Sequence, residues 1–247
     1  MERQILHERL IKIRTGVSRM TQMLDAMQDM DLPFHEMRYR HLSLEAALLA
    51  ERTACSIRNL VFDADLISRP KLLLQSAHTQ GIEVSHSNGI VTIHLPGLLP
   101  KRSSRINTAF LTEPLYACLE EYEKKCPLPR YHSCVVCFLH VYDYALPSRR
   151  VRDYDNLECK QLLDTAAAFL MTDDSGLMCD LYHTTLSGDQ DCTMLVIMDK
   201  SRFPSWLEQQ KEHENGSEPC RIFKENPGRK PDPPQNTAGR PAAADPP

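Results

Sequence analysis

A change in the spacing of the apolar residues at Gly81 constrains this chain most, because it separates a helical part from a part that contains strands. Before Gly81, apolar residues recur alternately four and three positions apart, which predicts two helices that each carry one apolar seam. The first seam consists of Leu6, Leu10, Ile13, Val17, Met20, Leu24 and Met27, and Pro33 follows the end of that helix. We expect the second helix to begin at Ser43 as its N-cap, with a seam of Ala47, Ala50, Ala54, Ile57 and Val61.

The two seams have two interpretations. In the first, the helices form an antiparallel hairpin and bury their seams against each other within one chain. In the second, the seam forms a coiled coil with another copy of the chain or with a different protein. The hairpin is favoured in a chain of 247 residues. Together with a short helix from Arg69 to about Gln80, it makes up a predicted helical interaction region over residues 1–80.

Beyond Gly81 the apolar residues alternate. Two alternating segments flank Asn88-Gly89, a dipeptide typical of the type I′ turn of a β-hairpin. Pairing across this turn puts four apolar residues on one face: Ile82, Val84, Ile93 and Leu95. We expect further strands near 133–142, 177–186 and 192–199, and helices near 113–125 and 156–170. The prediction is an α+β fold, in which the helical hairpin precedes a small mixed or antiparallel sheet with two packed helices over residues 81–212.

The last 35 residues, from His213 to Pro247, hold 8 of the 17 prolines and few large apolar side chains. Such a segment buries too little apolar surface to offset the entropy lost on ordering. We therefore predict a disordered Pro-rich tail over residues 213–247.

The composition excludes several classes of protein. The nine glycines are never closer than eight positions apart, so no glycine-rich phosphate loop exists, and the motifs of zinc and serine hydrolases are missing. No run of about 18 apolar residues occurs, so we expect no membrane span. The chain begins with charged residues rather than a secretory leader, and its cysteines are scattered, which favours a reducing, cytoplasmic setting. Cys134 and Cys137, three apart in an apolar strand, are expected on opposite faces as core residues.

Two carboxylates in an otherwise polar stretch indicate a metal site. Asp153 and Asp155 lie two positions apart, so both side chains leave an extended chain on the same side. Neighbouring carboxylates repel each other unless a cation joins them, and carboxylate oxygens suit Mg²⁺ or Mn²⁺. The alternative is structural, with Asp155 or Asn156 as a helix N-cap. Asp173-Asp174 has the same two interpretations, a ligand or a turn that leads into a strand.

A lysine accompanies these carboxylates. Lys160 and Asp164 lie one turn apart on the helix that follows, away from its apolar stripe. Lys160 is placed to reach a substrate phosphate, and the alternative is an ordinary solvated ion pair with Asp164. Two basic loops lie nearby in the sequence, and they contain Lys101, Arg102 and Arg105 in one and Arg149, Arg150 and Arg152 in the other. The net charge of −4 arises from the middle of the chain, so a contact with nucleic acid has to be local.

In this order, the segment Arg152-Asp-Tyr-Asp-Asn156, then Lys160, then Asp173-Asp174 before a strand resembles the core of the RusA family of Holliday junction resolvases. These are Mg²⁺-dependent endonucleases that act as homodimers on four-way DNA. The resemblance covers about residues 90–199. It implies that Asp153, Asp155 and Asp174 bind the metal ion and that Lys160 is the catalytic lysine.

The resemblance leads to a prediction of function. We expect a Mg²⁺- or Mn²⁺-dependent, structure-selective endonuclease that acts on branched DNA as a homodimer. Its DNA backbone contacts are expected from the two basic loops, through Lys101, Arg102, Arg105, Arg149, Arg150 and Arg152. The alternative is a non-catalytic RusA-like module that binds DNA or a protein partner through its N-terminal helical hairpin. Metal binding distinguishes the two.

Overall fold

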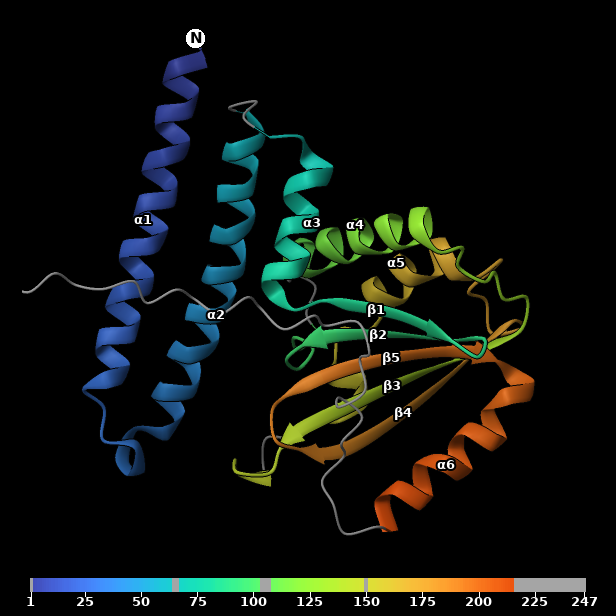
Figure 1. The fold of residues 1–247 in the computed structure, drawn as a ribbon. Helices are drawn as coiled ribbons and strands as arrows, with labels where there is room; N and C mark the ends of the chain where they lie inside the picture. Colours follow the sequence, from blue (N-terminus) through green and yellow to red (C-terminus); the bar gives the residue numbers. More distant parts are fainter. Residues whose placement is uncertain (1, 64–66, 103–107, 149–150, 216–247) are drawn as a thin grey trace, which may run out of the picture.

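A computed structural model describes residues 2–63, 67–102, 108–148 and 151–215 of the chain. It is built around a five-stranded mixed sheet in the order β1-β2-β5-β3-β4 (Figure 1). The strands are β1 (Glu83–Ser87), β2 (Ile90–Pro96), β3 (Cys134–Asp143), β4 (Cys179–Gly188) and β5 (Cys192–Asp199). β3 and β4 are parallel, and the other neighbouring pairs are antiparallel. The predicted α+β class is confirmed.

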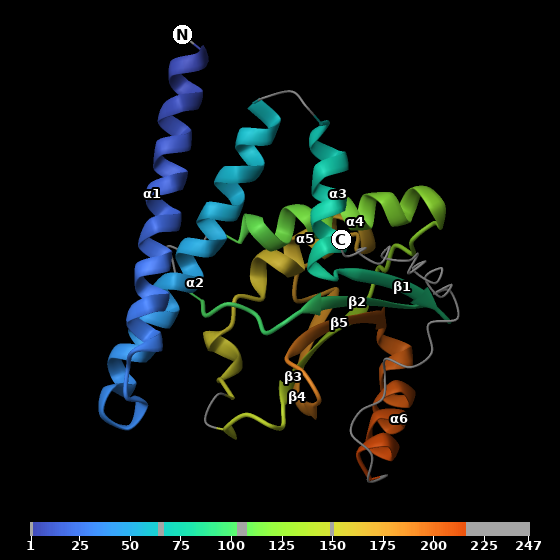
Figure 2. The same cartoon turned by 60° about the vertical axis from the view of Figure 1, so that its left-hand side comes forward.

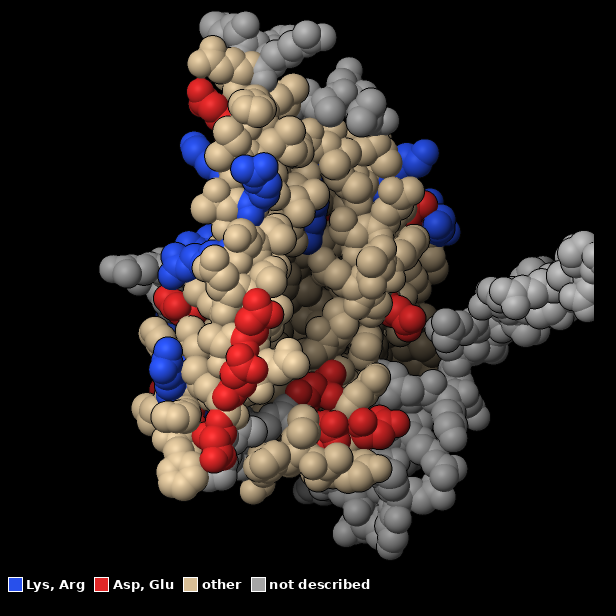
Figure 3. All heavy atoms as spheres, turned by 90° about the vertical axis from the view of Figure 1, so that its left-hand side faces the viewer, with Lys and Arg blue, Asp and Glu red and all other residues tan. Residues whose placement is uncertain are grey.

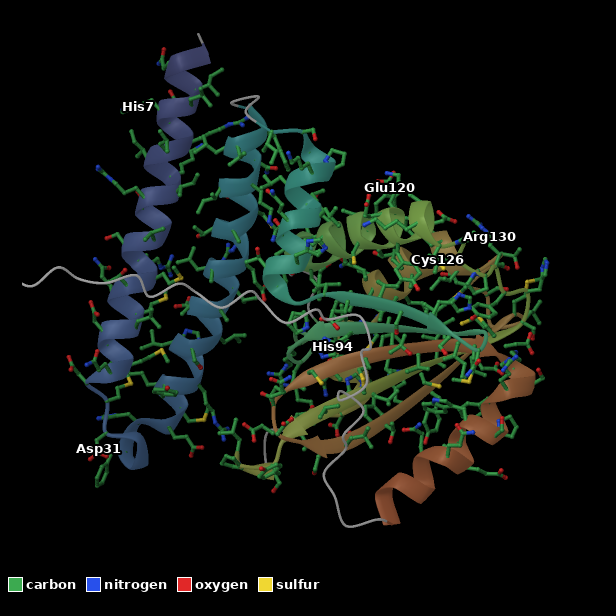
Figure 4. All side chains as sticks on the ribbon, in the orientation of Figure 1. His7, Asp31, His94, Glu120, Cys126 and Arg130 are labelled. Carbon is green, nitrogen blue, oxygen red and sulfur yellow. The ribbon has the colours of Figure 1, made fainter. Side chains whose placement is uncertain are left out.

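Helices cover both faces of the sheet. On one face lie α4 (Ala109–Lys125) and α5 (Lys160–Leu170), and on the other lies α6 (Phe203–Asn215) (Figures 1 and 2). β3 packs into both layers, because Cys134 belongs to the core beneath α4 and α5 whereas Cys137 belongs to the core beneath α6. This confirms that the two cysteines lie on opposite faces. Arg130, labelled in Figure 4, ties the loop before β3 to α5 through a 3.2 Å hydrogen bond to the Ala168 carbonyl.

The first hairpin of the sheet forms as predicted. Asn88 and Gly89 have φ values of 51° and 66°, which are the two positive values that a type I′ turn requires. Val84 pairs with Ile93 across it. The four predicted inward-facing residues, Ile82, Val84, Ile93 and Leu95, all contribute to the core beneath α4 and α5.

The N-terminal helices form an antiparallel hairpin within the chain, as predicted, from α1 (Glu2–Gln28) and α2 (Leu32–Asp63) (Figures 1 and 2). The predicted start of the second helix is wrong. α2 begins at Leu32, with a kink at His35, and Ser43 lies inside it and donates its hydroxyl to the Arg40 carbonyl at 3.0 Å. Pro33 lies in the first turn of α2, where its missing N–H costs no helical hydrogen bond.

The predicted seams of the two helices are also wrong in part. Leu10, Val17 and Leu24 of the first seam are 50%, 39% and 53% exposed. In the second seam Ala47, Ala50 and Ile57 are exposed. Ile13 and Met20 of the predicted first seam do lie at the contact. They are joined there by Gly16 and Met23 of α1 and by Ala46, Leu49 and Thr53 of α2.

Gly16 explains the choice of face. A Cβ atom at this position would lie 3.3 Å from Thr53 Oγ1 and 3.7 Å from Leu49 Cδ1, so the missing side chain lets α2 approach closely. Small residues set the distance between packed helices. The apolar periodicity alone therefore pointed to a face that overlaps the contact face only in part.

The hairpin is attached to the sheet layer through α4. Arg58 of α2 is buried, and its guanidinium donates to the carbonyls of Ala109 and Phe110 at 3.4 and 2.9 Å. α3 (Arg69–Gln80) packs along α4, and its predicted end before Gly81 is confirmed. Gly81 has a φ of 80°, the left-handed conformation typical of a glycine that follows a helix.

Three sequence predictions concern the ends of elements and the membrane. The predicted tail begins too early, because residues 213–215 form the last turn of α6, and residues 216–247 lie outside the described part of the chain. The helix expected from 156 begins at Lys160, after a 3-10 turn, η2 (Tyr154–Asn156). None of the described helices combines the length and apolar character that crossing a bilayer requires.

Candidate functional site

The candidate site is built on the segment between β3 and α5, which lies at the end of β3 on the side where the helical hairpin lies (Figures 1 and 2). Backbone pairing with the loop after β2 holds it in place. Arg102 N donates to the Asn156 carbonyl at 2.7 Å, and Glu158 N donates to the Pro100 carbonyl at 2.9 Å. Lys101 and Leu157 form an antiparallel bridge between the two segments. The first predicted basic loop therefore lies directly against the predicted metal-binding segment.

Asp153 and Asp155 flank Tyr154 at η2, and both are exposed. Asp153 is the N-cap residue of η2, but its side chain makes no capping hydrogen bond. The predicted capping role of Asp155 or Asn156 is wrong, because α5 begins at Lys160 and its N-cap residue is Cys159. The two carboxylates are thus exposed at the surface without a capping function.

Lys160, at the start of α5, lies near Asp174, in the segment before β4. Lys160 Nζ lies 3.0 and 3.1 Å from the two carboxylate oxygens of Asp164, which is the solvated pair given as the alternative. The hydrogen bond and charge of Asp164 raise the pKa of Lys160, and Asp174 adds to the effect. Asp173 has the turn role, because its carboxylate accepts a 3.3 Å hydrogen bond from Ser175 N. Hydrogen bonds from the side chain and the backbone of Ser175 lower the pKa of Asp173.

The structure describes three of the six basic residues that were predicted in the two loops. Lys101, Arg102 and Arg152 are exposed, and the Arg152 guanidinium donates to the Leu99 carbonyl at 3.4 Å. Arg152 N also donates to the Tyr142 hydroxyl at 3.2 Å. Arg105, Arg149 and Arg150 lie outside the described residues. The placed cations border the segment that carries Asp153 and Asp155.

A different set of side chains converges beneath this segment. Within the described part of the chain, one group of three possible metal ligands is found, and it consists of His140, Cys159 and His183. Their ligand atoms all lie within 4.8 Å of one another, whereas Asp153, Asp155 and Asp174 form no such group. His140 comes from β3, His183 from β4 and Cys159 from the N-cap of α5.

Aromatic rings enclose the two histidines. The Tyr154 ring stacks on His140 and His183, with centroid distances of 5.5 and 5.0 Å. Phe138 stacks on His183 at 5.0 Å. The Tyr154 hydroxyl lies 3.1 Å from Thr185 Oγ1, a hydrogen bond that fixes the ring over the histidines. The side of η2 that carries Tyr154 therefore covers the histidine pair.

Burial controls the protonation of this group. It lowers the pKa of His140 to about 4, with a further contribution from His183, and it lowers the pKa of His183 as well. Burial, together with the charge of Glu158, raises the pKa of the Cys159 thiol to about 12, against a smaller opposing effect of Arg102. At neutral pH both imidazoles are neutral, so each has one nitrogen lone pair available for a hydrogen bond or a metal ion.

Sequence reasoning missed this group. His140 and His183 are 43 positions apart, and no spacing motif links them to Cys159. One signal in the sequence could have identified His140 as a buried histidine. It follows Phe138 by two residues in an apolar strand, so the two side chains face the same core. The pairing of β3 with β4 was needed to bring His183 beside it.

The chain was also compared with known proteins. The model of a family of unknown function, DUF6100, matches residues 2–225, which is most of the chain. No curated protein matches the sequence.

Proposed function

The chain belongs to the DUF6100 family, whose function is unknown, and we propose that it is a Mg²⁺- or Mn²⁺-dependent endonuclease that acts on branched DNA. One observation carries the proposal: the backbone pairing of residues 100–102 with residues 156–158. It places the cations Lys101 and Arg102 beside the segment of Asp153 and Asp155. A surface with carboxylates bordered by cations suits a phosphate backbone bound through a divalent ion.

Asp153 and Asp155 fit a hard divalent ion in their chemistry. Mg²⁺ keeps several waters and is held by one or two carboxylates together with the phosphates of its substrate. Both side chains are exposed, and neither forms a hydrogen bond or ion pair with another described residue. The ion would activate water and stabilise charge at the scissile phosphate. Lys101, Arg102 and Arg152 would bind the neighbouring phosphates.

Asp174 and Lys160 complete the proposal as the RusA resemblance implies, with Asp174 as a metal ligand and Lys160 as the catalytic lysine. Asp174 does not converge with the other two aspartates, so it would have to approach the ion when DNA binds. Lys160 would have to exchange Asp164 for a phosphate oxygen. This exchange costs little, because an exposed ion pair of this kind contributes at most about 1 kcal/mol.

The test is cleavage of four-way, flap and linear DNA by the full chain with Mg²⁺ or Mn²⁺, and with EDTA as the metal-free condition. Asp153→Asn and Asp155→Asn should each lower the cleavage rate at least about 100-fold while the fold is retained. The matched control is Asp189→Asn, an exposed aspartate in the turn between β4 and β5. A wild-type chain that cleaves none of these substrates with either metal would refute the proposal, as would equal losses in the control.

A second candidate function rests on the helical hairpin, as a module that binds nucleic acid without cutting it. A groove of about 510 Å³ is lined by α1, α2 and the first residue of α3, and its described lining has cations but no carboxylate. The cations are Arg9, Lys12, Arg52 and Arg69, of which Arg69 also forms an ion pair with Glu113 at 2.6 Å. If phosphates bind there, Lys12→Gln and Arg52→Gln should each reduce the salt dependence of DNA affinity by about one ion. Unchanged salt dependence in both variants would remove this candidate.

Homodimer formation is part of the first proposal, and α1 offers a surface for it. Its exposed Leu10, Val17 and Leu24 recur every seven residues, the spacing of a coiled-coil position. Figure 3 views this side of the molecule and shows a broad uncharged surface between its charged side chains. Sedimentation should give a dimer for the wild type and a folded monomer for Val17→Asp. A monomeric wild type would exclude this interface.

A further inference from the structure

We propose that His140, Cys159 and His183 bind a transition-metal ion of the Zn²⁺ class at a site separate from the exposed aspartates. Two imidazoles and one thiol form a ligand set that prefers Zn²⁺ and related ions over Mg²⁺. The proposal does not depend on nuclease activity, because no residue of the proposed Mg²⁺ site belongs to this group.

The spacing of the two imidazoles fits tetrahedral coordination. His140 Nε2 and His183 Nδ1 lie 3.3 Å apart, and in the metal-free chain one of these nitrogens donates a hydrogen bond to the other. Two nitrogens that each lie about 2.05 Å from one tetrahedral Zn²⁺ are separated by about 3.3 Å. The Cys159 sulfur completes a group whose ligand atoms all fall within 4.8 Å. Small side-chain rotations would therefore bring three ligands to one ion, and a fourth position would remain for water or an added ligand.

The environment of His140 supports a ligand role over a purely structural one. Its side chain is 1% exposed, and Nδ1 is buried without a hydrogen-bond partner among the described residues. A buried polar atom without a partner costs about 1–3 kcal/mol. A core position of this kind would be more stable with an apolar side chain. A metal ion bound through Nε2 gives Nδ1 no partner, but its binding free energy would offset that cost.

Binding has a defined proton balance. Both imidazoles stay neutral, but the proton of the N–H···N contact between His140 Nε2 and His183 Nδ1 must move to the far nitrogen of its own ring, whereas the Cys159 thiol must lose its proton to become the ligand. One bound ion therefore releases one proton to solvent, and a sulfur–metal bond replaces the S–H bond. No oxidant or reductant is involved.

Tyr154 couples this site to the surface segment. Its ring covers both histidines, and its chain neighbours are Asp153 and Asp155. A metal ion bound to Cys159 would fix the chain just after η2. The same ion would fix His140 and His183, on which the Tyr154 ring stacks. We expect metal binding to slow amide exchange at Asn156 and Leu157, whose N–H groups bond to the carbonyls of Asp153 and Tyr154.

The experiment uses the full chain, freed of metal and then titrated with Co²⁺ as a spectroscopic substitute for Zn²⁺. We expect one equivalent of Co²⁺ to produce the intense visible bands of four-coordinate cobalt and a thiolate-to-cobalt charge-transfer band, and Zn²⁺ to displace it. Cys159→Ser should abolish the charge-transfer band, and His183→Gln should weaken binding at least about tenfold. The control is Cys126→Ser, which removes an exposed thiol.

Circular dichroism establishes that each variant is folded, so that lost binding reports the site and not the fold. Asp153→Asn should keep the cobalt spectrum, which separates this site from the proposed Mg²⁺ site even if no nuclease activity exists. Absence of a cobalt spectrum in the wild type would overturn the proposal. A charge-transfer band that persists in Cys159→Ser, or disappears in Cys126→Ser, would also overturn it.

Discussion

Acidification should destabilise this protein through the buried His140. Burial lowers the pKa of His140 in the folded chain from 6.5 to about 4. Above pH 6.5 the imidazole is neutral in both the folded and the unfolded chain, so it adds no pH dependence. Between pH 6.5 and 4 the unfolded chain binds the proton and the folded chain does not, so the free energy of unfolding falls as pH falls.

The size of the effect follows from the pKa difference. Each pH unit within the window changes the free energy of unfolding by about 1.4 kcal/mol, so the whole window amounts to about 3 kcal/mol. His140 is 1% exposed, so solvent does little to screen the effect. From pH 7 to pH 5 the expected loss from this group is about 2 kcal/mol. His183 acts in the same direction, because burial lowers its pKa too.

The assay is urea unfolding of the metal-free chain at pH 7, 6 and 5. His140→Phe keeps an aromatic ring beside Phe138 and removes the titration, so its free energy of unfolding should change less over this range. His41→Gln, at an exposed histidine of α2, is the matched control and should follow the wild type. If His140→Phe loses as much stability as the wild type between pH 7 and 5, the buried neutral imidazole is not the cause.

Two further predictions concern packing. In Gly188→Ala the new Cβ would lie 2.5 Å from Val141 Cγ1, so the variant should lose about 1–3 kcal/mol in urea unfolding, whereas Gly176→Ala, with nothing within 4 Å, should not. Met23→Asp should lose at least about 2 kcal/mol because the residue is buried between α1 and α2, whereas Ile11→Asp, at an exposed apolar residue of α1 outside the proposed dimer surface, should stay within about 0.5 kcal/mol by the same measurement. Equal melting of Met23→Asp and Ile11→Asp would show that the helices pack through another face.

The order of helices and strands up to β5 followed from the sequence because the signals are local, whereas α6 was not predicted. The alternation around Asn88-Gly89 and the left-handed cap at Gly81 depend only on a few neighbouring residues. The helix and strand periods differ enough to separate the two parts of the chain. What local patterns do not contain is the pairing of strands. β4 and β5 follow each other in sequence, yet β3 lies between them in the sheet.

In the helical hairpin, local patterns also failed to identify fully which face of α1 contacts α2. Heptad spacing selected the exposed Leu10, Val17 and Leu24 along with Ile13 and Met20, because it counts apolar residues and ignores size. The observed contact depends on Gly16, where a missing side chain lets α2 approach, and on Met23, a flexible side chain that fills the space beside it. Size at the contact therefore outweighed the number of apolar residues.

In the candidate site, too, local features were predicted from the sequence and features that depend on strand pairing were not. The sequence predicted the acidic segment, because two aspartates two residues apart are visible without a fold. It missed the histidines, because only the β3–β4 register places His183 opposite Phe138 and next to His140. Its placement of the helix start at residue 156 was also wrong, and this hid the position of Cys159 at the N-cap of α5.

The exposed aspartates and the buried group of two histidines and a cysteine suit two different classes of metal ion. The exposed carboxylates on one side of η2 favour a hydrated ion that exchanges readily, whereas the buried nitrogens and sulfur on the other side favour an ion that is held and loses its water. An exposed site on a short 3-10 turn has few contacts of its own to fix it. The stacking of Tyr154 on His140 and His183 provides such contacts from below. An ion bound by His140, Cys159 and His183 would therefore help to position Asp153 and Asp155. It would do so by fixing the orientation of η2 and not through direct contact with substrate.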